Sequence, residues 1–326
     1  MSDKLQVSVG EVRFTKAFWG VGWLVHEVVT LVVNSAARSA GKMRAALPGI
    51  ERVLGERGFG VRVLRTEDSP GSAERLARES LDSAWVVACG GDGTVNGVVQ
   101  GLAGTGVAMG VVPLGTANAL ARNLRIPLDP LAAVTRLLTY RAETIPLGEI
   151  RSSGDTRYFV VMAGCGPDGA LAETLSGVRK NRFGRGAYYG QAAWLFLTRR
   201  WPAFRVEYRL VGSAEWVTAD AAALMASRVP DLGGLFTSLT PRAGLRDEHL
   251  HVQLLGAPGH LSLPAWFAFS RLRLTNPWLT TVDVEELRCS ALGGGVVRVQ
   301  ADGEALGMLP ISLRVAGGML RLLMPV

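Results

Sequence analysis

The first half of the chain alternates short apolar runs with amphipathic segments. The apolar runs predict buried strands, and the segments between them, which place apolar residues three or four positions apart, predict helices. The expected strands cover 28–34, 59–66, 83–88 and 107–113. The expected helices cover 39–57, 72–80, 95–102 and 117–124. Strands that alternate with helices in this order predict a parallel sheet covered by helices.

The pattern changes at about residue 145. Apolar and polar residues then alternate over short runs, which is typical of antiparallel strands with one buried face. The expected strands cover 158–163, 204–210, 221–226, 250–255, 286–290, 296–300 and 311–315, and a helical stretch at 187–197 interrupts them.

Together the two patterns predict an α/β plus all-β fold. We expect a Rossmann-like domain with a parallel sheet at 28–144, followed by an antiparallel β-sandwich domain at 145–326. The final strand of the second domain could return to the first. Residues 1–27 form an N-terminal extension, to which we assign no function.

Composition and charge narrow the class of protein. With 326 residues, 48% of them hydrophobic, the chain can bury a large core. The formal net charge of +7 favours acidic partners, such as an anionic membrane surface, a nucleotide or nucleic acid. No helix-turn-helix or zinc-finger pattern supports nucleic acid, so we expect none as a partner.

Cysteine and histidine spacing gives no sign of a metal centre or a disulfide framework. Three widely separated cysteines indicate a reducing cytoplasm. The four histidines form no pattern of zinc ligands or of a catalytic triad, and His249 and His251 are expected to alternate along a strand.

The sequence also contains no evident membrane anchor. The apolar stretch 17–33 is interrupted by His26 and Glu27 and is shorter than the roughly 20 residues that a spanning helix needs. The first ten residues lack the apolar core of a signal peptide. We therefore expect a cytoplasmic protein that is soluble or peripheral to a membrane.

The clearest candidate for chemistry lies at 85–96, where a buried strand, a turn with Gly90, Gly91 and Gly93, and a helix follow one another. Glycines let the backbone approach a ligand closely, and the free amides of a helix N-terminus favour an anion, so a phosphate site is predicted. Asp92 would repel a bare phosphate and therefore indicates a metal ion, ordered water or a hydroxyl to be deprotonated. It could instead only cap the helix.

A second glycine turn, Gly115-Thr116-Ala117-Asn118, follows the strand at 107–113 and again opens a helix. With the Gly-Gly-Asp-Gly-Thr sequence at 90–94, it resembles the lipid-kinase branch of the superfamily that contains diacylglycerol and sphingosine kinases, NAD kinases and phosphofructokinases. A nucleotide-binding half followed by a β-rich half is similar to these lipid kinases over 30–326. Helix-capping turns alone are the less favoured explanation of the second loop, because Thr and Asn do cap helices.

The resemblance implies ATP as a cofactor and a set of nucleotide-binding residues. The loop from Asn34 to Gly41 resembles the family's Asn-Pro-x-Ser-Gly loop, with Ser35 in place of proline. Thr66 stands where the family has a threonine near the nucleotide. The implied set is Asn34, Thr66, Gly90, Gly91, Asp92, Gly93, Thr94, Gly115, Thr116 and Asn118.

Three acidic elements of the second half also resemble the family. Asp168, in 163–169, corresponds to the aspartate of its Gly-x-Gly-x-Asp-Ala element. Asp247 corresponds to the aspartate of Asp-Gly-x-Leu, which supports magnesium, although Glu248 here replaces the glycine. The sequence 302–304 is similar to Asp-Gly-Glu, whose glutamate lies at the catalytic centre. A bare Asp-Gly pair is more often a hairpin turn.

These correspondences assign roles. A lipid hydroxyl needs a base to accept its proton, and phosphoryl transfer otherwise needs positioning and charge neutralisation. We expect Glu304 to be the general base and Asp92 to be catalytic with it. The residues expected to order Mg2+ are Asp168, Asp247 and Asp302.

The sequence departs from the family at two positions of the first half. Gly97 replaces a glutamate that usually follows the first glycine loop, and Ala119 replaces an aspartate that follows the second. The loss of a carboxylate at Gly97 suggests an unusual substrate or slow turnover, and leaves open a non-catalytic lipid- or nucleotide-binding relative. An NAD kinase-like enzyme is the nearest enzymatic alternative.

The expected substrate is diacylglycerol or a related long-chain lipid, phosphorylated from ATP. Basic and aromatic residues at 179–189 and 194–201 suit an anionic membrane surface, so we expect a peripheral protein at the inner face of the membrane. A solvated loop and an ordinary core helix explain the same residues. An exposed strand edge of the second domain could form a homodimer.

Overall fold

The computed structural model describes residues 12–13, 27–36, 40–152, 154–170, 172, 201–232, 242–256 and 276–326. They fall into two compact units. The first unit extends to Gly115 and also contains Leu124–Thr144 and Leu320–Val326. The second contains Thr116–Asn123 and Ile145–Met319. The helix predicted at 187–197 and most of the basic and aromatic segments at 179–201 lie outside the described residues.

The first unit contains the predicted alternation of strands and helices. Its strands are β1 (Val12–Arg13), β2 (Glu27–Val33), β3 (Phe59–Arg65), β4 (Trp85–Gly90) and β5 (Ala108–Pro113). Its helices are α1 (Ala40–Gly55), α2 (Ser72–Arg78), α3 (Asp92–Leu102) and α5 (Pro130–Leu137).

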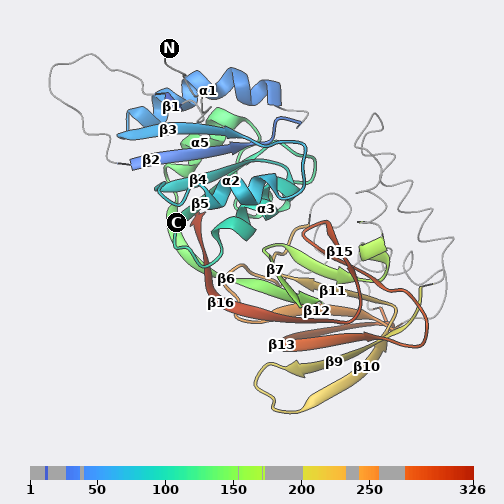
Figure 1. Ribbon diagram of the computed structural model, residues 1–326. Helices are drawn as coiled ribbons and strands as arrows, with labels where there is room; N and C mark the ends of the chain where they lie inside the picture. The colour runs from blue at the N-terminus through green and yellow to red at the C-terminus, as the bar shows by residue number, and fades with distance from the viewer. Residues whose placement is uncertain are drawn as a thin grey trace, which may run out of the picture. The chain divides into compact units, whose positions relative to one another are not determined.

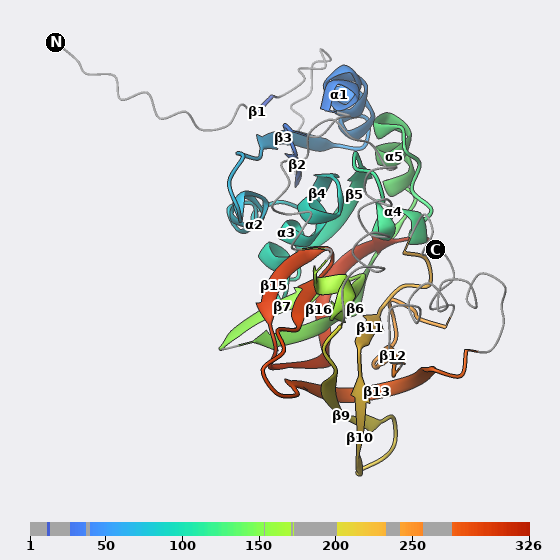
Figure 2. The same ribbon diagram turned by 90° about the vertical axis from the view of Figure 1, so that its right-hand side faces the viewer.

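The sheet of the first unit has the order β1-β3-β2-β4-β5, and β2 to β5 pair in parallel. Helices α1 and α5 pack on one face of this sheet and α2 and α3 on the other (Figure 1, Figure 2). Strands β2, β4 and β5 are buried on both faces, which explains their continuous apolar sequences. The predicted parallel α/β half is therefore confirmed.

The order of the strands creates a switch point between β2 and β4. From β2 the chain crosses to β3 on one side, and it then returns past β2 to β4 and β5 on the other side. Connections that leave in opposite directions open a crevice at the carboxyl ends of the two strands, and ligands of such sheets bind there. The loops after β2 and β4 are thus the positions where a ligand is expected.

The second unit consists mainly of strands. They are β6 (Arg141–Ser152), which begins in the first unit, β7 (Asp155–Phe159), β8 (Met162–Cys165), β9 (Phe204–Leu210), β10 (Trp216–Ala221), β11 (Ala223–Ser227), β12 (Leu250–Leu255), β13 (Leu279–Ala291), β14 (Arg298–Ala301), β15 (Glu304–Met308) and β16 (Ile311–Met324). Its short helix is α4 (Ala119–Asn123).

In the second unit, neighbouring strands in the order β16-β13-β12-β11-β8-β14-β15 pair antiparallel, and the hairpin β9–β10 is joined to β13. Buried side chains such as Phe159, Phe204 and Leu287 form its core. The end of β16 instead pairs in parallel with β5, within the first unit. The predicted antiparallel β half is confirmed.

Candidate active site

The glycine loop of the first unit is tightly packed. Strand β4 ends at Gly90 and α3 begins at Asp92, with Gly91 in extended conformation between them. A Cβ atom on Gly90 would lie 2.3 Å from the Oγ1 atom of Thr94, and one on Gly91 would lie 3.2 Å from the Cα atom of Gly115. The loop therefore requires glycine at position 90, and it brings the two glycine turns of the sequence against each other.

This packing places the N-terminus of α3 at the switch point between β2 and β4. The first amides of a helix have no partner within the helix, and its dipole favours negative charge at this end. Gly93 is exposed in the first turn, and the Asp92 side chain is half-buried. The arrangement can bind a phosphate group through backbone amides.

Hydrogen bonds fix the neighbouring loop beside the glycine loop. The Asn34 amide donates to the carbonyl of Cys89 at 2.9 Å, and its Nδ2 donates to Thr94 Oγ1 at 3.1 Å. The Thr66 amide donates to the carbonyl of Val33 at 2.9 Å. The structure thus brings several predicted nucleotide residues to one edge of the sheet: Asn34, Thr66, Gly90, Gly91, Asp92, Gly93, Thr94 and Gly115.

The other two predicted nucleotide residues belong to the second unit. Thr116 is exposed, whereas Asn118 is buried and has a left-handed backbone (φ 50°). Asparagine is one of the residues that tolerate this conformation. The Asn118 carbonyl accepts a hydrogen bond from the amide of Arg122 at 3.0 Å, so this residue starts the turn that becomes α4.

Gly97, which departs from the family, has a packing role. A Cβ atom at this position would lie 2.8 Å from the Cβ of Ala73 and 3.3 Å from the amide nitrogen of Glu74, and one at Gly101 would lie 2.6 Å from the Cβ of Ala77. The two glycines, one helical turn apart, allow α3 to lie close against α2. The absent glutamate is thus explained by helix packing, without reference to the substrate.

We expect Gly97→Glu to lower the free energy of unfolding by about 1–3 kcal/mol, because the new side chain overpacks the contact between α2 and α3. Urea denaturation measures the change. The matched control is Gly41→Glu in α1, where nothing lies within 4 Å of the added Cβ and stability should stay equal or rise slightly. Equal stability of the two variants would contradict the packing role.

In the second unit, Asp302 and Gly303 form the turn between β14 and β15. Both have positive φ, 47° and 84°, as a type I′ hairpin turn requires. The Asp302 carboxylate accepts backbone hydrogen bonds from Val160 at 2.9 Å, Val161 at 2.9 Å and Met162 at 3.0 Å. The predicted metal residue Asp302 thus anchors the hairpin to the bend between β7 and β8.

Gln300 connects this hairpin to a second predicted residue. Its Oε1 accepts a hydrogen bond from the Gly303 amide at 2.8 Å, and its Nε2 donates to the Asp168 carboxylate. A Cβ atom on Gly164 would collide with that carboxylate, so glycine is required there. The structure therefore brings the Asp168 and 302–304 motifs together through a residue that the sequence analysis missed.

Asp168 is predicted to make stability depend on pH. Burial raises the pKa of its carboxyl from 3.8 to about 6, although the hydrogen bond from Gln300 opposes this shift. The folded state therefore binds the proton more tightly than the unfolded state. The resulting stabilisation is complete below about pH 4 and is lost as the pH rises through about 6.

Asp168→Asn should remove this dependence. We expect the stability of the wild type relative to the variant to fall between about pH 4 and pH 7, by up to about 3 kcal/mol. Urea denaturation of both proteins across this range provides the test. A constant difference between them would contradict the raised pKa.

Glu304 is the first residue of β15, directly after the anchored turn. Its side chain is 41% exposed, and its Oε2 lies 3.9 Å from Nη2 of Arg157. The carboxylate is therefore accessible and lies near a positive charge. Its accessibility would let a substrate hydroxyl reach the carboxylate.

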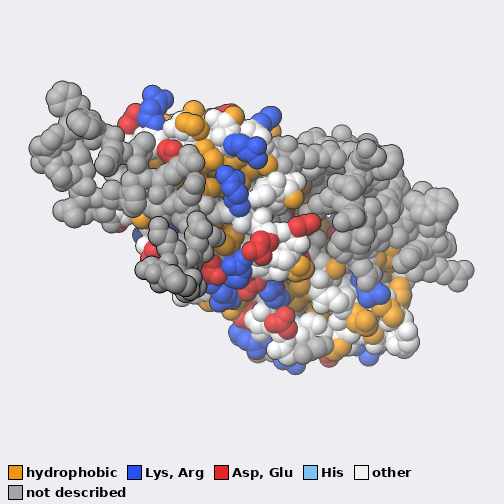
Figure 3. Space-filling model, turned by 45° about the horizontal axis from the view of Figure 1, so that its top comes forward, with side chains coloured by type: hydrophobic (Ala, Val, Ile, Leu, Met, Phe, Trp, Pro, Cys, Tyr) orange, Lys and Arg blue, Asp and Glu red, His pale blue; other side chains and the backbone are white. Residues whose placement is uncertain are grey.

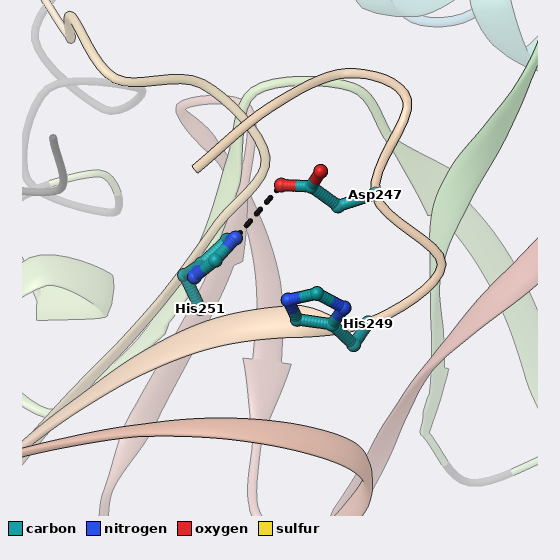
Figure 4. A group of neighbouring side chains, drawn as sticks. All are labelled: Asp247, His249 and His251. Atoms are coloured by element: carbon teal, nitrogen blue, oxygen red, sulfur yellow. Dashed lines mark hydrogen bonds and ion pairs between the residues drawn. The ribbon is translucent and has the colours of Figure 1, made fainter. Parts of the chain in front are cut away.

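The third predicted metal residue, Asp247, lies in a different set of contacts. Its Oδ2 accepts a hydrogen bond from the Gly244 amide at 2.7 Å and lies 2.7 Å from Nε2 of His251. Ligand atoms of Asp247, His249 and His251 lie within 4.8 Å of one another (Figure 4). The spacing of the histidines along the chain gave no metal-ligand pattern, and the fold adds Asp247, from the loop before β12, to two of them.

Below the same loop, Arg228 is a buried cation that the sequence analysis did not single out. It is 1% exposed, and its guanidinium donates to the carbonyls of Leu245 at 2.9 Å, Asp247 at 2.6 Å and His249 at 3.3 Å. Burial lowers its pKa to about 10, which leaves it charged at neutral pH. Arg228 comes directly after the last residue of β11. The apolar residues of that strand predict a strand only, so the sequence gives no signal of this role.

A comparison with solved structures shows which known fold the chain has. A diacylglycerol kinase from Bacillus anthracis str. Sterne superposes with a TM-score of 0.66 at 19% identity, covering 91% of this chain and 97% of that one. The parallel unit followed by an antiparallel unit is therefore a fold that this chain shares with that structure.

Sequence comparisons then establish the family. The model for the diacylglycerol kinase catalytic domain matches residues 28–150. The "probable lipid kinase YegS-like" protein of Pseudomonas aeruginosa is 31% identical over 91% of this chain and 94% of its own length. A diacylglycerol kinase of Mycobacterium tuberculosis is 27% identical over 92% and 96%. The chain belongs to the diacylglycerol kinase and YegS-like family of lipid kinases.

Proposed function

We propose that this lipid kinase uses ATP with Mg2+ and transfers the γ-phosphate to a hydroxyl of diacylglycerol or a related long-chain lipid. Family membership supports the reaction class. The structural observation that carries the proposal is the N-terminus of α3, where Gly90 and Gly91 bring backbone amides to the switch point of the parallel sheet.

In the first unit, the amides of α3 would bind the nucleotide phosphates. Mg2+ prefers carboxylate and phosphate oxygens, and the half-buried Asp92 carboxylate at the first turn of α3 fits such a donor set. When bound, the cation neutralises charge on the transferred phosphoryl group. Asn34 and Thr94, joined by a hydrogen bond, would hold the loop in place.

In the second unit, Glu304 would accept the proton of the lipid hydroxyl. The hydroxyl oxygen then forms a bond to the γ-phosphorus, the bond from that phosphorus to the bridging oxygen breaks, and ADP leaves. In this proposal, Asp302 and Asp168 act through the turn: Asp302 anchors it by backbone amides, and Asp168 holds it through Gln300.

The proposal includes binding at the inner face of an anionic membrane. Among the residues that the structure describes, each helix is too short or too polar to cross a bilayer. The β9–β10 hairpin exposes Val211, Trp216 and Val217, and the Arg288 guanidinium lies 4.5 Å from the Trp216 ring centre. Elsewhere, basic and acidic side chains lie close together on the face drawn in Figure 3. Co-sedimentation with anionic and neutral vesicles checks the preference.

The proposed activity is tested by offering the purified protein labelled ATP and Mg2+ with mixed micelles of diacylglycerol, sphingosine or ceramide, and with NAD as a separate acceptor. We expect label in lipid and none in NAD. Asp92→Asn should abolish most of the transfer, whereas Asp82→Asn, an exposed aspartate paired with Arg62, should not. Labelled NAD would instead support an NAD kinase-like enzyme, and ATP binding without any transfer would support a non-catalytic relative.

A further inference from the structure

A cluster of one carboxylate and two imidazoles lies at the start of β12. His249 and His251 are two residues apart, so they lie on the same face of the chain entering the strand. Asp247 precedes them in the adjoining loop, and ligand atoms of the three side chains lie within 4.8 Å of one another. Figure 4 shows the carboxylate and both rings around a common space.

His251 is oriented by a fourth side chain from the neighbouring strand. His251 and Asp283 are paired across β12 and β13, and Nδ1 of the ring lies 2.7 Å from Asp283 Oδ1. Nε2 lies 2.7 Å from Asp247 Oδ2. A histidine that binds a metal usually donates its other ring N–H to such a carboxylate, which fixes the tautomer and the direction of the ring.

Both ring nitrogens of His251 lie 2.7 Å from a carboxylate oxygen. Two carboxylates accept hydrogen bonds, whereas a neutral imidazole has a single N–H to donate. If Nδ1–H donates to Asp283, then Nε2 either carries a second proton or binds a cation that Asp247 also binds. The doubly protonated ring and the cation-bound ring differ in the role of His249. A bound cation would use His249 as a third ligand, whereas a doubly protonated His251 ring would not.

The donor set does not fit Mg2+, which takes oxygen ligands in a strict octahedron. The carbonyl oxygens of Leu245, Asp247 and His249, which could supply such ligands, already accept hydrogen bonds from Arg228. The side chains that remain offer two imidazole nitrogens and one carboxylate. This combination suits zinc and similar first-row cations.

A cation has a route to the cluster. His249 lines a surface hollow of about 490 Å3 together with Glu248, Glu285 and Glu286, while Arg209 and Arg314 contribute the opposing charges. His251 is 8% exposed, whereas the Asp247 side chain is 30% exposed. The hollow therefore reaches one of the three proposed ligands, His249, from solvent.

We propose that Asp247, His249 and His251 bind a divalent transition cation of the zinc class, with Asp283 orienting His251. Bonds of about 2.0–2.1 Å would hold the ligand atoms roughly 3.0–3.4 Å apart. Side-chain rotation of the partly exposed Asp247 and His249 provides the adjustment. The site ties the loop before β12 to β12 and, through Asp283, to β13.

The test uses the full chain, freed of metal by a chelator and dialysis, with neither nucleotide nor lipid present. Calorimetric titration with Zn2+ should show one site per chain. His249→Ala should weaken it at least about 100-fold, and Asp283→Asn, which removes only the orienting carboxylate charge, about 10- to 100-fold. Millimolar Mg2+ should leave the Zn2+ affinity unchanged. The control is Asp220→Asn, an exposed aspartate of β10 paired with Arg205, which should bind as the wild type does.

Thermal melting of the metal-free variants shows whether each one folds. The proposal is overturned if folded His249→Ala binds Zn2+ as tightly as the wild type, if no stoichiometric Zn2+ binds, or if equimolar Mg2+ displaces Zn2+. In those cases Asp247, His249 and His251 do not form the proposed zinc site. Because the titration contains no ATP or lipid, its result is independent of kinase activity.

Discussion

Replacement of Glu304 by glutamine is expected to lower the turnover number for lipid phosphorylation by about 10²- to 10⁴-fold. Glutamine has nearly the same shape but cannot accept the proton of the lipid hydroxyl. The surrounding turn should stay intact, because Asp302 anchors it through backbone amides that the substitution does not touch. The KM for ATP should therefore change little, since the proposed phosphate site belongs to α3.

The matched control for this prediction is Glu285→Gln. Glu285 is 39% exposed and lies 3.1 Å from Arg209, whereas Glu304 is 41% exposed and lies 3.9 Å from Arg157. Loss of a half-exposed, arginine-paired carboxylate is thus common to both variants. Initial rates at saturating ATP compare them. Retention of more than about a third of the activity by Glu304→Gln would exclude its role as the base.

The second large effect concerns Arg228. Arg228→Met should lower the free energy of unfolding by about 3–5 kcal/mol. The substitution keeps much of the apolar stem but removes the donors that now satisfy the buried carbonyls of Pro146 at 3.0 Å, Leu245 at 2.9 Å and Asp247 at 2.6 Å. Buried acceptors left without a donor keep their full desolvation cost.

Urea denaturation at neutral pH measures this change, with Arg205→Met as the control. Arg205 is 47% exposed and lies 3.4 Å from Asp220, so its loss should cost at most about 1 kcal/mol. Similar destabilisation by the two substitutions would show that the carbonyls around Arg228 find water or other donors. Arg228 would then not be the cation that holds the loop before β12 in place.

The parallel half of the fold was predictable because its signals are local. Buried strands have continuous apolar sequences, and glycine turns mark where β4 and β5 end. Helix α5 was nevertheless missed, although Asp129 caps it by accepting from the Ala132 amide and Pro130 occupies its first turn. The sequence Asp-Pro is a recognisable helix start, so this signal was available.

The contacts around the candidate site were harder to predict from the sequence, because they join residues far apart in the chain. Asp302 reaches amides about 140 positions away, and the pairing of His251 with Asp283 depends on the register of β12 and β13. Sequence motifs marked Asp302 and Asp247 but could not show what their carboxylates contact. No sequence motif includes Arg228, since only the folded loop turns several carbonyls towards it.

The proposed kinase activity is tested most directly by locating the transferred phosphate chemically. Purified protein, Mg2+ and ATP labelled at the γ-phosphate are incubated with diacylglycerol micelles, and the extracted lipid is analysed by mass spectrometry. We expect a lipid heavier by one labelled phosphoryl group on its free hydroxyl, formed by the wild type and not by Glu304→Gln. Unmodified lipid, with ATP bound to the protein, would contradict the proposed transfer.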